Sequence, residues 1–235
     1  MLSLISGVLA LVAGRGAVHG VSRAWELALP SELRHPTMSM PAEAAPLLAT
    51  LNEAAATKSV DDQRVVDALL ELESTMRRAA KEDAAVSTQT RDALDGAWQL
   101  VFTTGTVDTQ KKLGTRVNYF PVKAVQTFDT STMEISNGIF FGDTALLKFF
   151  GVFEWDEKAR RLNFDFEQIA LLGLRFNLPK GGAAKIGAST GLGAESNGVN
   201  AQKRELPAFF NWISADEQIA TARGGGGGLA LWRRL

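Results

Sequence analysis

The chain has no cysteine among its 235 residues, so disulfides, thiolate nucleophiles, cysteine-ligated zinc and iron–sulfur clusters are excluded. Histidine is nearly absent. The two that occur, His19 and His35, lie near the N-terminus, and the remainder of the chain has no imidazole for acid–base catalysis, metal binding or haem ligation. What remains is carboxylates, lysines, arginines, hydroxyls and the single Tyr119. This set favours a binding protein over an enzyme, and we predict neither catalytic residues nor a metal site.

An excess of positive charge is also missing. The formal net charge at pH 7 is −1. A nearly neutral chain lacks the basic surface that attracts phosphate backbones, so we expect no nucleic-acid partner.

The first 37 residues differ in composition from the rest of the chain. An apolar run over residues 2–12 is too short to span a bilayer, and small residues follow it. The stretch from Arg15 to Arg34 then contains three arginines and only two acidic residues. This order is typical of a signal peptide followed by a transit peptide. We therefore interpret residues 1–37 as a targeting sequence; the alternative is a folded or membrane-associated N-terminal helix.

Residues 38–87 carry the periodicity of helices, and we predict one over residues 42–56 and another over 60–85. The second has one apolar stripe at helical spacing. It consists of Val65, Leu69, Leu72 and Met76. We expect the stripe to pack against the rest of the protein. Binding to a membrane surface is the alternative, but the acidic polar face suits it less well.

At Gly96 the period changes, and apolar and polar residues alternate as they do in strands with one buried face. Roughly eight short alternating segments follow, separated by turn residues. We predict a mainly β domain over residues 88–235, an antiparallel barrel that begins near Asp95 and folds without the residues before Thr88. A glycine-rich stretch over residues 181–200 interrupts the pattern and indicates a lid or a disordered insertion.

Motifs at both ends of this domain resemble those of a known family. Gly96 and Trp98 form a Gly-x-Trp opening, and residues 209–234 combine an aromatic-Trp pair, an Asp-Glu step, an Arg-Gly turn and a closing Leu-Trp-Arg. With the segments at 126–139 and 153–166 between them, they resemble the plastid lipid-associated proteins, the plant and algal fibrillins. The resemblance covers residues 94–235. It implies a lipocalin-like barrel in a plastid, on thylakoids or plastoglobules, that binds a carotenoid, a prenylquinone or an acyl lipid and requires no cofactor.

Inward positions of the alternating segments supply the predicted ligand lining. They are Trp98, Leu100, Phe102, Ile135, Phe153, Phe164, Phe166 and Phe176. These side chains either surround a cavity that a polyene or prenyl chain occupies, or fill the barrel themselves.

The family resemblance also implies a polar closure of the barrel end. Its members are Gly96, Trp98, Asp216, Arg223 and Arg233. Either Arg223 or Arg233 is expected to stack on the Trp98 indole.

Two other functions remain open. The aromatic pairs at 140–141, 149–150 and 209–210 place one ring on each face of a strand, and outward rings suit a structural subunit docked on a thylakoid photosynthetic complex. The third candidate is an enzyme acting on isoprenoid lipids. Its acid would come from Asp129, Asp165 or Glu167, although carboxylates in alternating strands normally face solvent.

Overall fold

The structure, a computed structural model, describes residues 40–178 and 208–235. The predicted targeting sequence and the glycine-rich stretch 181–200 lie outside the described residues. The helical elements are η1 (Ala42–Ala44), α2 (Ala45–Thr57), α3 (Asp62–Glu82), α4 (Ala85–Ala93) and α5 (Val107–Leu113). The two predicted helices are thus confirmed, whereas the short helices α4 and α5 were not predicted.

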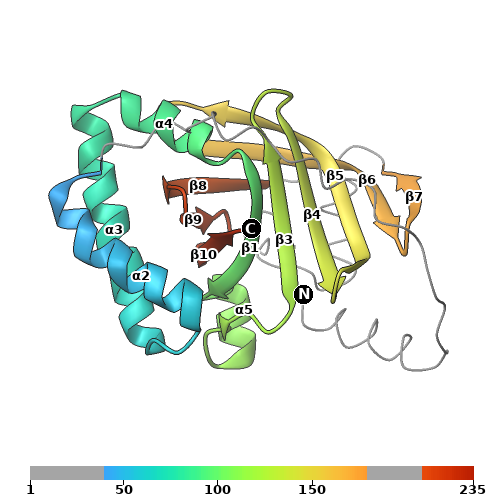
Figure 1. The fold of residues 1–235 in the computed structure, drawn as a ribbon, viewed down its shortest axis with the longest axis horizontal. Helices are drawn as coiled ribbons and strands as arrows, with labels where there is room; N and C mark the ends of the chain where they lie inside the picture. The colour runs from blue at the N-terminus through green and yellow to red at the C-terminus, as the bar shows by residue number, and fades with distance from the viewer. Residues whose placement is uncertain (1–39, 179–207) are drawn as a thin grey trace.

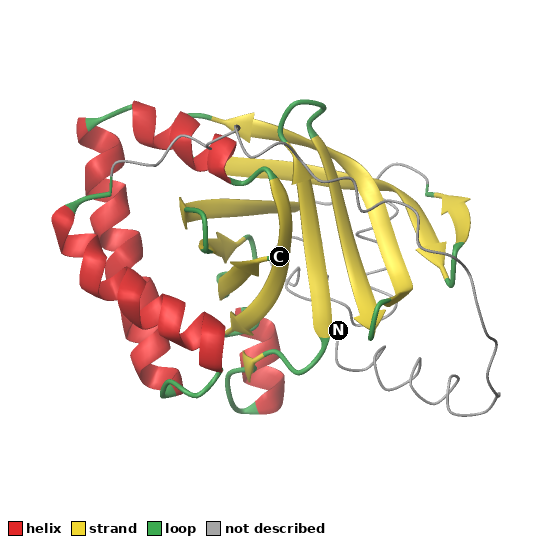
Figure 2. Ribbon diagram, in the orientation of Figure 1, coloured by secondary structure: helices red, strands yellow, loops and turns green. Residues whose placement is uncertain are grey.

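Strands make up a larger part of the described chain than helices do, as the alternating pattern predicts. The strands are β1 (Gly96–Thr103), β2 (Asn118–Tyr119), β3 (Lys123–Asp129), β4 (Glu134–Phe141), β5 (Thr144–Asp156), β6 (Arg161–Leu171), β7 (Leu174–Asn177), β8 (Ala208–Ala215), β9 (Ile219–Gly224) and β10 (Leu229–Arg234). All belong to one antiparallel ten-stranded sheet (Figure 2).

This sheet closes on itself. Its strands pair in the order β10-β9-β8-β6-β5-β4-β3-β1, and β10 also pairs with β1, with Leu100 opposite Trp232. The result is a ring of strands. The short strand β2 pairs with β1, and β7 pairs with β6 and projects beyond the ring (Figure 1). Because every strand of the ring is hydrogen-bonded on both sides, the ring has one face turned inward and one turned outward.

The inward face is an apolar cluster to which every strand of the ring contributes. Its buried members include Trp98, Phe128, Ile135, Phe153, Leu162, Phe166, Trp212, Ala220 and Trp232. Glycine at position 151 of β5 lets this strand approach β6 closely where β6 has a β-bulge, since a Cβ there would lie 1.9 Å from the Asp165 carbonyl oxygen.

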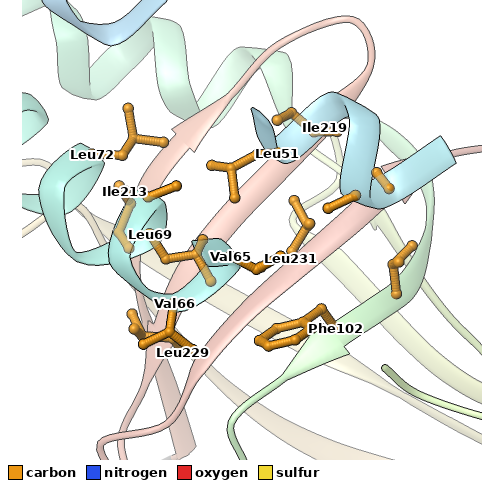
Figure 3. Packing of buried hydrophobic residues seen from close by; sticks show 14 of the residues in the cluster. Leu51, Val65, Val66, Leu69, Leu72, Phe102, Ile213, Ile219, Leu229 and Leu231 are labelled. Atoms are coloured by element: carbon orange, nitrogen blue, oxygen red, sulfur yellow. The ribbon is translucent and has the colours of Figure 1, made fainter. Parts of the chain in front are cut away.

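Helices α2 and α3 cover the outward face of β1, β8, β9 and β10, as Figures 1 and 3 show. The predicted stripe of α3 is completely buried there, which confirms that it packs on the domain. It meets Val101, Phe102, Ile213, Ile219, Leu229 and Leu231 from the strands. The predicted helical segment and the predicted β domain therefore share one hydrophobic core.

Helix α3 is also tied to the sheet by an ion pair. Arg223 of β9 donates from Nε to Glu73 Oε1 (2.8 Å) and from Nη2 to Glu73 Oε2 (2.5 Å). This hydrogen bonding lowers the pKa of Glu73. Bidentate pairing of this kind is geometrically specific, so it fixes the position of the helix along the sheet.

Candidate ligand site inside the strand ring

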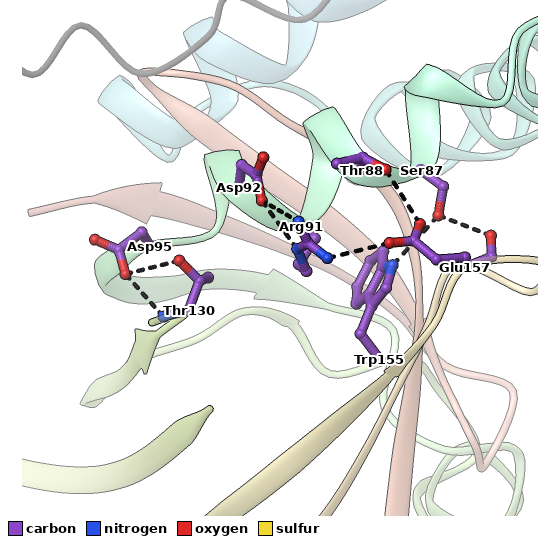
Figure 4. A network of polar contacts seen from close by, with 8 residues as sticks. All are labelled: Ser87, Thr88, Arg91, Asp92, Asp95, Thr130, Trp155 and Glu157. Atoms are coloured by element: carbon purple, nitrogen blue, oxygen red, sulfur yellow. Dashed lines mark hydrogen bonds and ion pairs between the residues drawn. The ribbon is translucent and has the colours of Figure 1, made fainter. Parts of the chain in front are cut away.

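One end of the ring is closed by helix α4 and the segment that follows it. Ala93 and Leu94 are buried with the inward cluster, and Trp98 Nε1 donates to the Leu94 carbonyl oxygen (2.7 Å). A polar network holds the helix in place (Figure 4). Ser87 Oγ donates to the Glu157 carbonyl oxygen (2.7 Å), and Arg91 contacts the Glu157 carboxylate (3.1 Å).

An arginine does stack on Trp98, but it is neither of the two predicted. The guanidinium carbon of Arg234 lies 4.1 Å from the Trp98 ring centroid. Its nitrogens donate to the carbonyl oxygens of Ala93 (2.5 Å), Asp95 (2.6 Å) and Asp216 (3.1 Å). Gly96 makes room for it, because a Cβ there would lie 3.1 Å from Arg234 Nη1. Gly96 and Trp98 thus belong to the closure, together with Arg234.

The other residues of the predicted closure have different positions. Asp216 caps the turn between β8 and β9, accepting from the backbone N–H groups of Gln218 (2.7 Å) and Ile219 (2.8 Å). Arg223 points outward to α3, as described above. Arg233 is exposed and donates to Gln99 (3.2 Å). Arg223 and Arg233 lie on the outward faces of β9 and β10. Arg234 stands two residues after the inward Trp232 and therefore shares its face. The stacking prediction was wrong for this reason.

Large aromatic side chains fill the ring near its closed end. The Trp212 ring centroid lies 5.2 Å from that of Trp232 and 5.5 Å from that of Phe128, and Phe128 lies 6.1 Å from Phe153. Trp98 and Trp212 are at most 1% exposed. Alanines at 220, 222 and 230 leave space for these rings. In this half of the ring, side chains occupy the interior.

Toward the other end the inward aromatics become more accessible. Phe149, Phe164 and Phe210 are only partly buried, although all three pack on the inward cluster. Their rings form a continuous series: Phe149 contacts Phe166, Phe166 contacts Phe164, and Phe164 stacks on Phe210, each at 5.3 Å between centroids. Partly exposed aromatic faces of this kind offer contact area for an apolar ligand.

The structure places most of the predicted lining in the inward cluster. Trp98, Leu100, Ile135, Phe153, Phe164 and Phe166 all belong to it. Phe102 does not: a β-bulge between Leu100 and Phe102 reverses the alternation, and Phe102 packs against Tyr119 and the helices. Phe176 is also misplaced, since it is 54% exposed on β7 outside the ring.

In the aromatic pairs 140–141, 149–150 and 209–210, a lysine or arginine lies over each outward ring. Lys123 lies over Phe140 (5.7 Å), Lys148 and Arg175 both lie over Phe150 (5.0 and 4.2 Å), and Arg161 lies over Phe209 (4.4 Å). Their inward neighbours Phe149 and Phe210 pack inside the ring. The outward rings at 140, 150 and 209 are thus not bare apolar patches.

Bare apolar side chains gather instead at two hairpin tips. Phe141 at the end of β4 is 63% exposed, and Leu172, Leu174 and Phe176 around the β6–β7 turn are 58%, 68% and 54% exposed. On the outer face beside them, burial and the nearby charge of Arg175 lower the pKa of Lys148. Neither Lys148 nor Arg175 forms an ion pair within the described part of the chain. These tips combine apolar and positively charged groups.

None of the three carboxylates considered for catalysis lies in the inward cluster. Asp129 holds the β3–β4 turn by accepting from Ser131 and Thr132, and these hydrogen bonds lower its pKa. Asp165 accepts from the Phe166 N–H (2.9 Å), and Glu167 is exposed.

Within residues 40–178 and 208–235, no cluster of acidic or histidine side chains is suited to a metal ion, and no helix has the length and apolar character to cross a membrane.

Two polar groups inside the ring were not predicted. Gln126 Oε1 and Trp212 Nε1 are buried and have no hydrogen-bond partner among the described residues. A signal for Gln126 exists in the sequence, because it stands two residues before Phe128 in an alternating strand and therefore shares its inward face.

The sequence matches the PAP_fibrillin family over residues 46–229, which includes α3, all but the first residue of α2, and the ring strands from β1 to β9. A search of curated proteins finds no match. Among solved structures, an uncharacterized protein from Bacteroides eggerthii DSM 20697 is similar, with 10% identity and a TM-score of 0.37 over 60% of this chain and 99% of that one.

Proposed function

This chain belongs to the PAP_fibrillin family, and we propose on that basis that it is a plastid protein that binds an apolar lipid at the open end of its strand ring. The proposed ligand is a carotenoid, a prenylquinone or an acyl lipid. One observation carries the proposal: Phe149, Phe164 and Phe210 face the interior of the ring but stay partly exposed.

The energetics favour a ligand on these rings. Covering roughly 150–200 Å² of apolar surface contributes about 4–5 kcal/mol, at about 25 cal/mol per Å². The closed end, filled by Trp98, Trp212 and Trp232, limits the depth to which a chain can enter. We therefore propose a shallow site, in which part of a long ligand lies on the aromatic series and the rest extends toward the hairpin tips.

We further propose that the ligand leaves unchanged. The side chains that face the proposed site are hydrocarbon and aromatic groups and the neutral amide of Gln126, and none of these offers an acid or base to a double bond or an ester. Chromatography of a ligand after prolonged incubation with the protein tests this point. Recovery of an altered product would favour the enzyme alternative.

Quenching of tryptophan emission by a carotenoid tests the binding proposal, since Phe210 lies 5.8 Å from Trp212 and 5.7 Å from Trp232. We expect saturable quenching in the unmodified protein and its loss in Phe164→Glu, which places a charge among the rings. Asn163→Glu is the matched control, because it adds the same charge at the preceding residue of β6, whose side chain lies on the outer face. Absence of saturable quenching with every carotenoid and prenylquinone tried, together with failure of acyl lipids to displace a bound fluorescent fatty acid, would refute the proposal.

A second candidate function, peripheral docking on a thylakoid or plastoglobule surface or on a photosynthetic complex, is favoured by the exposed tips. Phe141, Leu172 and Leu174 offer apolar contact, and Lys148 and Arg175 offer positive charge. Sedimentation with vesicles of anionic plastid lipid tests docking on lipid. Leu174→Asp should release the protein, whereas Leu70→Asp, at an exposed leucine of α3, should not. If Leu174→Asp sediments like the unmodified protein, the tips are not the docking surface.

A further inference from the structure

Two buried polar atoms face the interior of the ring without partners in the part of the chain that the structure describes. Gln126 is 6% exposed and its Oε1 accepts no hydrogen bond; Trp212 is 1% exposed and its Nε1–H donates none. Native proteins seldom leave such groups unpaired, because each has lost its hydrogen bonds to water. One of these atoms is an acceptor and the other is a donor.

Both residues adjoin the aromatic series. In the strand register Gln126 stands between Trp98 and Asn137, and Asn137 stands opposite Phe149. These four side chains therefore form one inward row that leads from the closed end to the partly exposed Phe149. From the other side of the ring, Trp212 contacts Phe210 (5.8 Å between centroids). A ligand that lies on Phe149 and Phe210 thus directs its leading end toward the two polar groups.

We infer that the ligand carries a hydroxyl group on the end that enters the ring. This inference rests on the proposed function. A hydroxyl can donate to Gln126 Oε1 and can accept from Trp212 Nε1–H, so its chemistry suits both atoms. A carbonyl pairs only with the indole, and a hydrocarbon end pairs with neither. The class of ligand is therefore an alcohol or a phenol on a long apolar chain, such as a hydroxylated polyene or a prenylquinol.

Discrimination against a ligand that lacks the hydroxyl arises because its binding leaves the buried groups unpaired. We expect a prenyl alcohol to bind roughly tenfold more tightly than the matching hydrocarbon, a ratio that corresponds to about 1.4 kcal/mol. The methyl ether of the alcohol accepts but does not donate, so its affinity should lie between the two.

The experiment measures dissociation constants of these three probes by displacement of a fluorescent fatty acid from the full chain. Gln126→Met keeps the length of the side chain without its polar atoms, and Trp212→Phe keeps an aromatic ring without the N–H. Each should reduce the preference for the alcohol while the hydrocarbon binds as before. Gln168→Met is the matched control, because Gln168 bonds to Asn177 outside the ring, and it should keep the full preference.

The outcomes separate this inference from the proposed function. Equal affinity for alcohol, ether and hydrocarbon in the unmodified protein overturns the hydroxyl inference and leaves lipid binding intact. The same conclusion follows if Gln126→Met and Trp212→Phe retain the preference for the alcohol. If none of the three probes binds and no other lipid binds either, both proposals fail. Thermal unfolding of both variants gives the folding control, and we expect Gln126→Met to unfold at a higher temperature because it removes an unpaired buried amide.

Discussion

Removal of α2 and α3 should prevent the β domain from folding. The two helices cover six strand residues that are at most 3% exposed: Val101, Phe102, Ile213, Ile219, Leu229 and Leu231. Burial of such a side chain contributes about 1.5–3 kcal/mol, so the six together contribute about 9–18 kcal/mol. A domain of this size has a total stability of about 5–15 kcal/mol. The loss is therefore comparable with the whole free energy of unfolding.

The assay compares a chain of residues 40–235 with one of residues 83–235, which keeps Asp83 because its carboxylate accepts from the Ala85 N–H at the start of α4 (2.8 Å). Far-UV circular dichroism during urea unfolding should give a cooperative transition for the first chain and none for the second. The sequence alone predicts the opposite, because its strand pattern begins only at Gly96. A cooperative, β-rich transition of residues 83–235 would refute the reasoning from packing.

Point substitutions in α3 give a graded form of the same test. Leu69→Ala and Leu72→Ala should each lower the free energy of unfolding by about 2–5 kcal/mol, because both leucines are completely buried against the sheet. Leu70→Ala is the control on the same helix, since Leu70 is 46% exposed. Equal effects at positions 69 and 70 would contradict the observed packing of the helix.

Two further predictions concern arginines of the last strands. Arg234→Ala should lower the free energy of unfolding by about 2–4 kcal/mol, since it leaves three partly buried carbonyl groups without this donor. The loss should be non-additive with that of Trp98→Phe. Arg233→Ala, at the exposed neighbour, should be nearly neutral, and equal losses for the two arginines would contradict the stacking. Glu73 has its pKa lowered below 4.5 by its hydrogen bond to Arg223, so the pair stabilises the fold above roughly that pH and the contribution disappears as pH falls through the lower folded-state value. Glu73→Gln should therefore be less stable at neutral pH and lose less stability than the unmodified protein in urea titrations from roughly pH 5 to pH 2.

How far the sequence predicts this structure depends on whether a strand has one buried face or two. In β6 only the inner face is deeply buried, and the alternation of Leu162, Phe164 and Phe166 correctly predicts their inward direction. In β9 and β10 both faces are buried, one inside the ring and one under the helices. Apolar residues occupy both faces of such strands, so hydrophobicity alone does not tell which residues point inward. This ambiguity is why Arg234 was missed.

Bulges limit the prediction in a second way, because each extra residue exchanges the two faces. The bulge in β1 turns Phe102 outward after Leu100, and no local residue type marks it. The bulge in β6 lies opposite Gly151 of β5, and this glycine is a signal in the sequence. The reason for the glycine, however, is the carbonyl group of Asp165 on the neighbouring strand. A contact of that kind depends on pairing between strands, which a single sequence does not specify.

Polar residues at inward positions are where sequence and structure together are most informative about function. Apolar lining residues serve packing and ligand binding equally well, so Ile135 or Phe153 does not distinguish a filled ring from a binding site. A buried amide that lacks a partner in the described protein does distinguish them, because it lowers stability unless something else pairs with it. Gln126 has this property, while its outward counterparts Gln99 and Gln168 are paired with Arg233 and Asn177. The position of one glutamine relative to the alternation of its strand is therefore a stronger indication of a ligand than the whole set of phenylalanines around it.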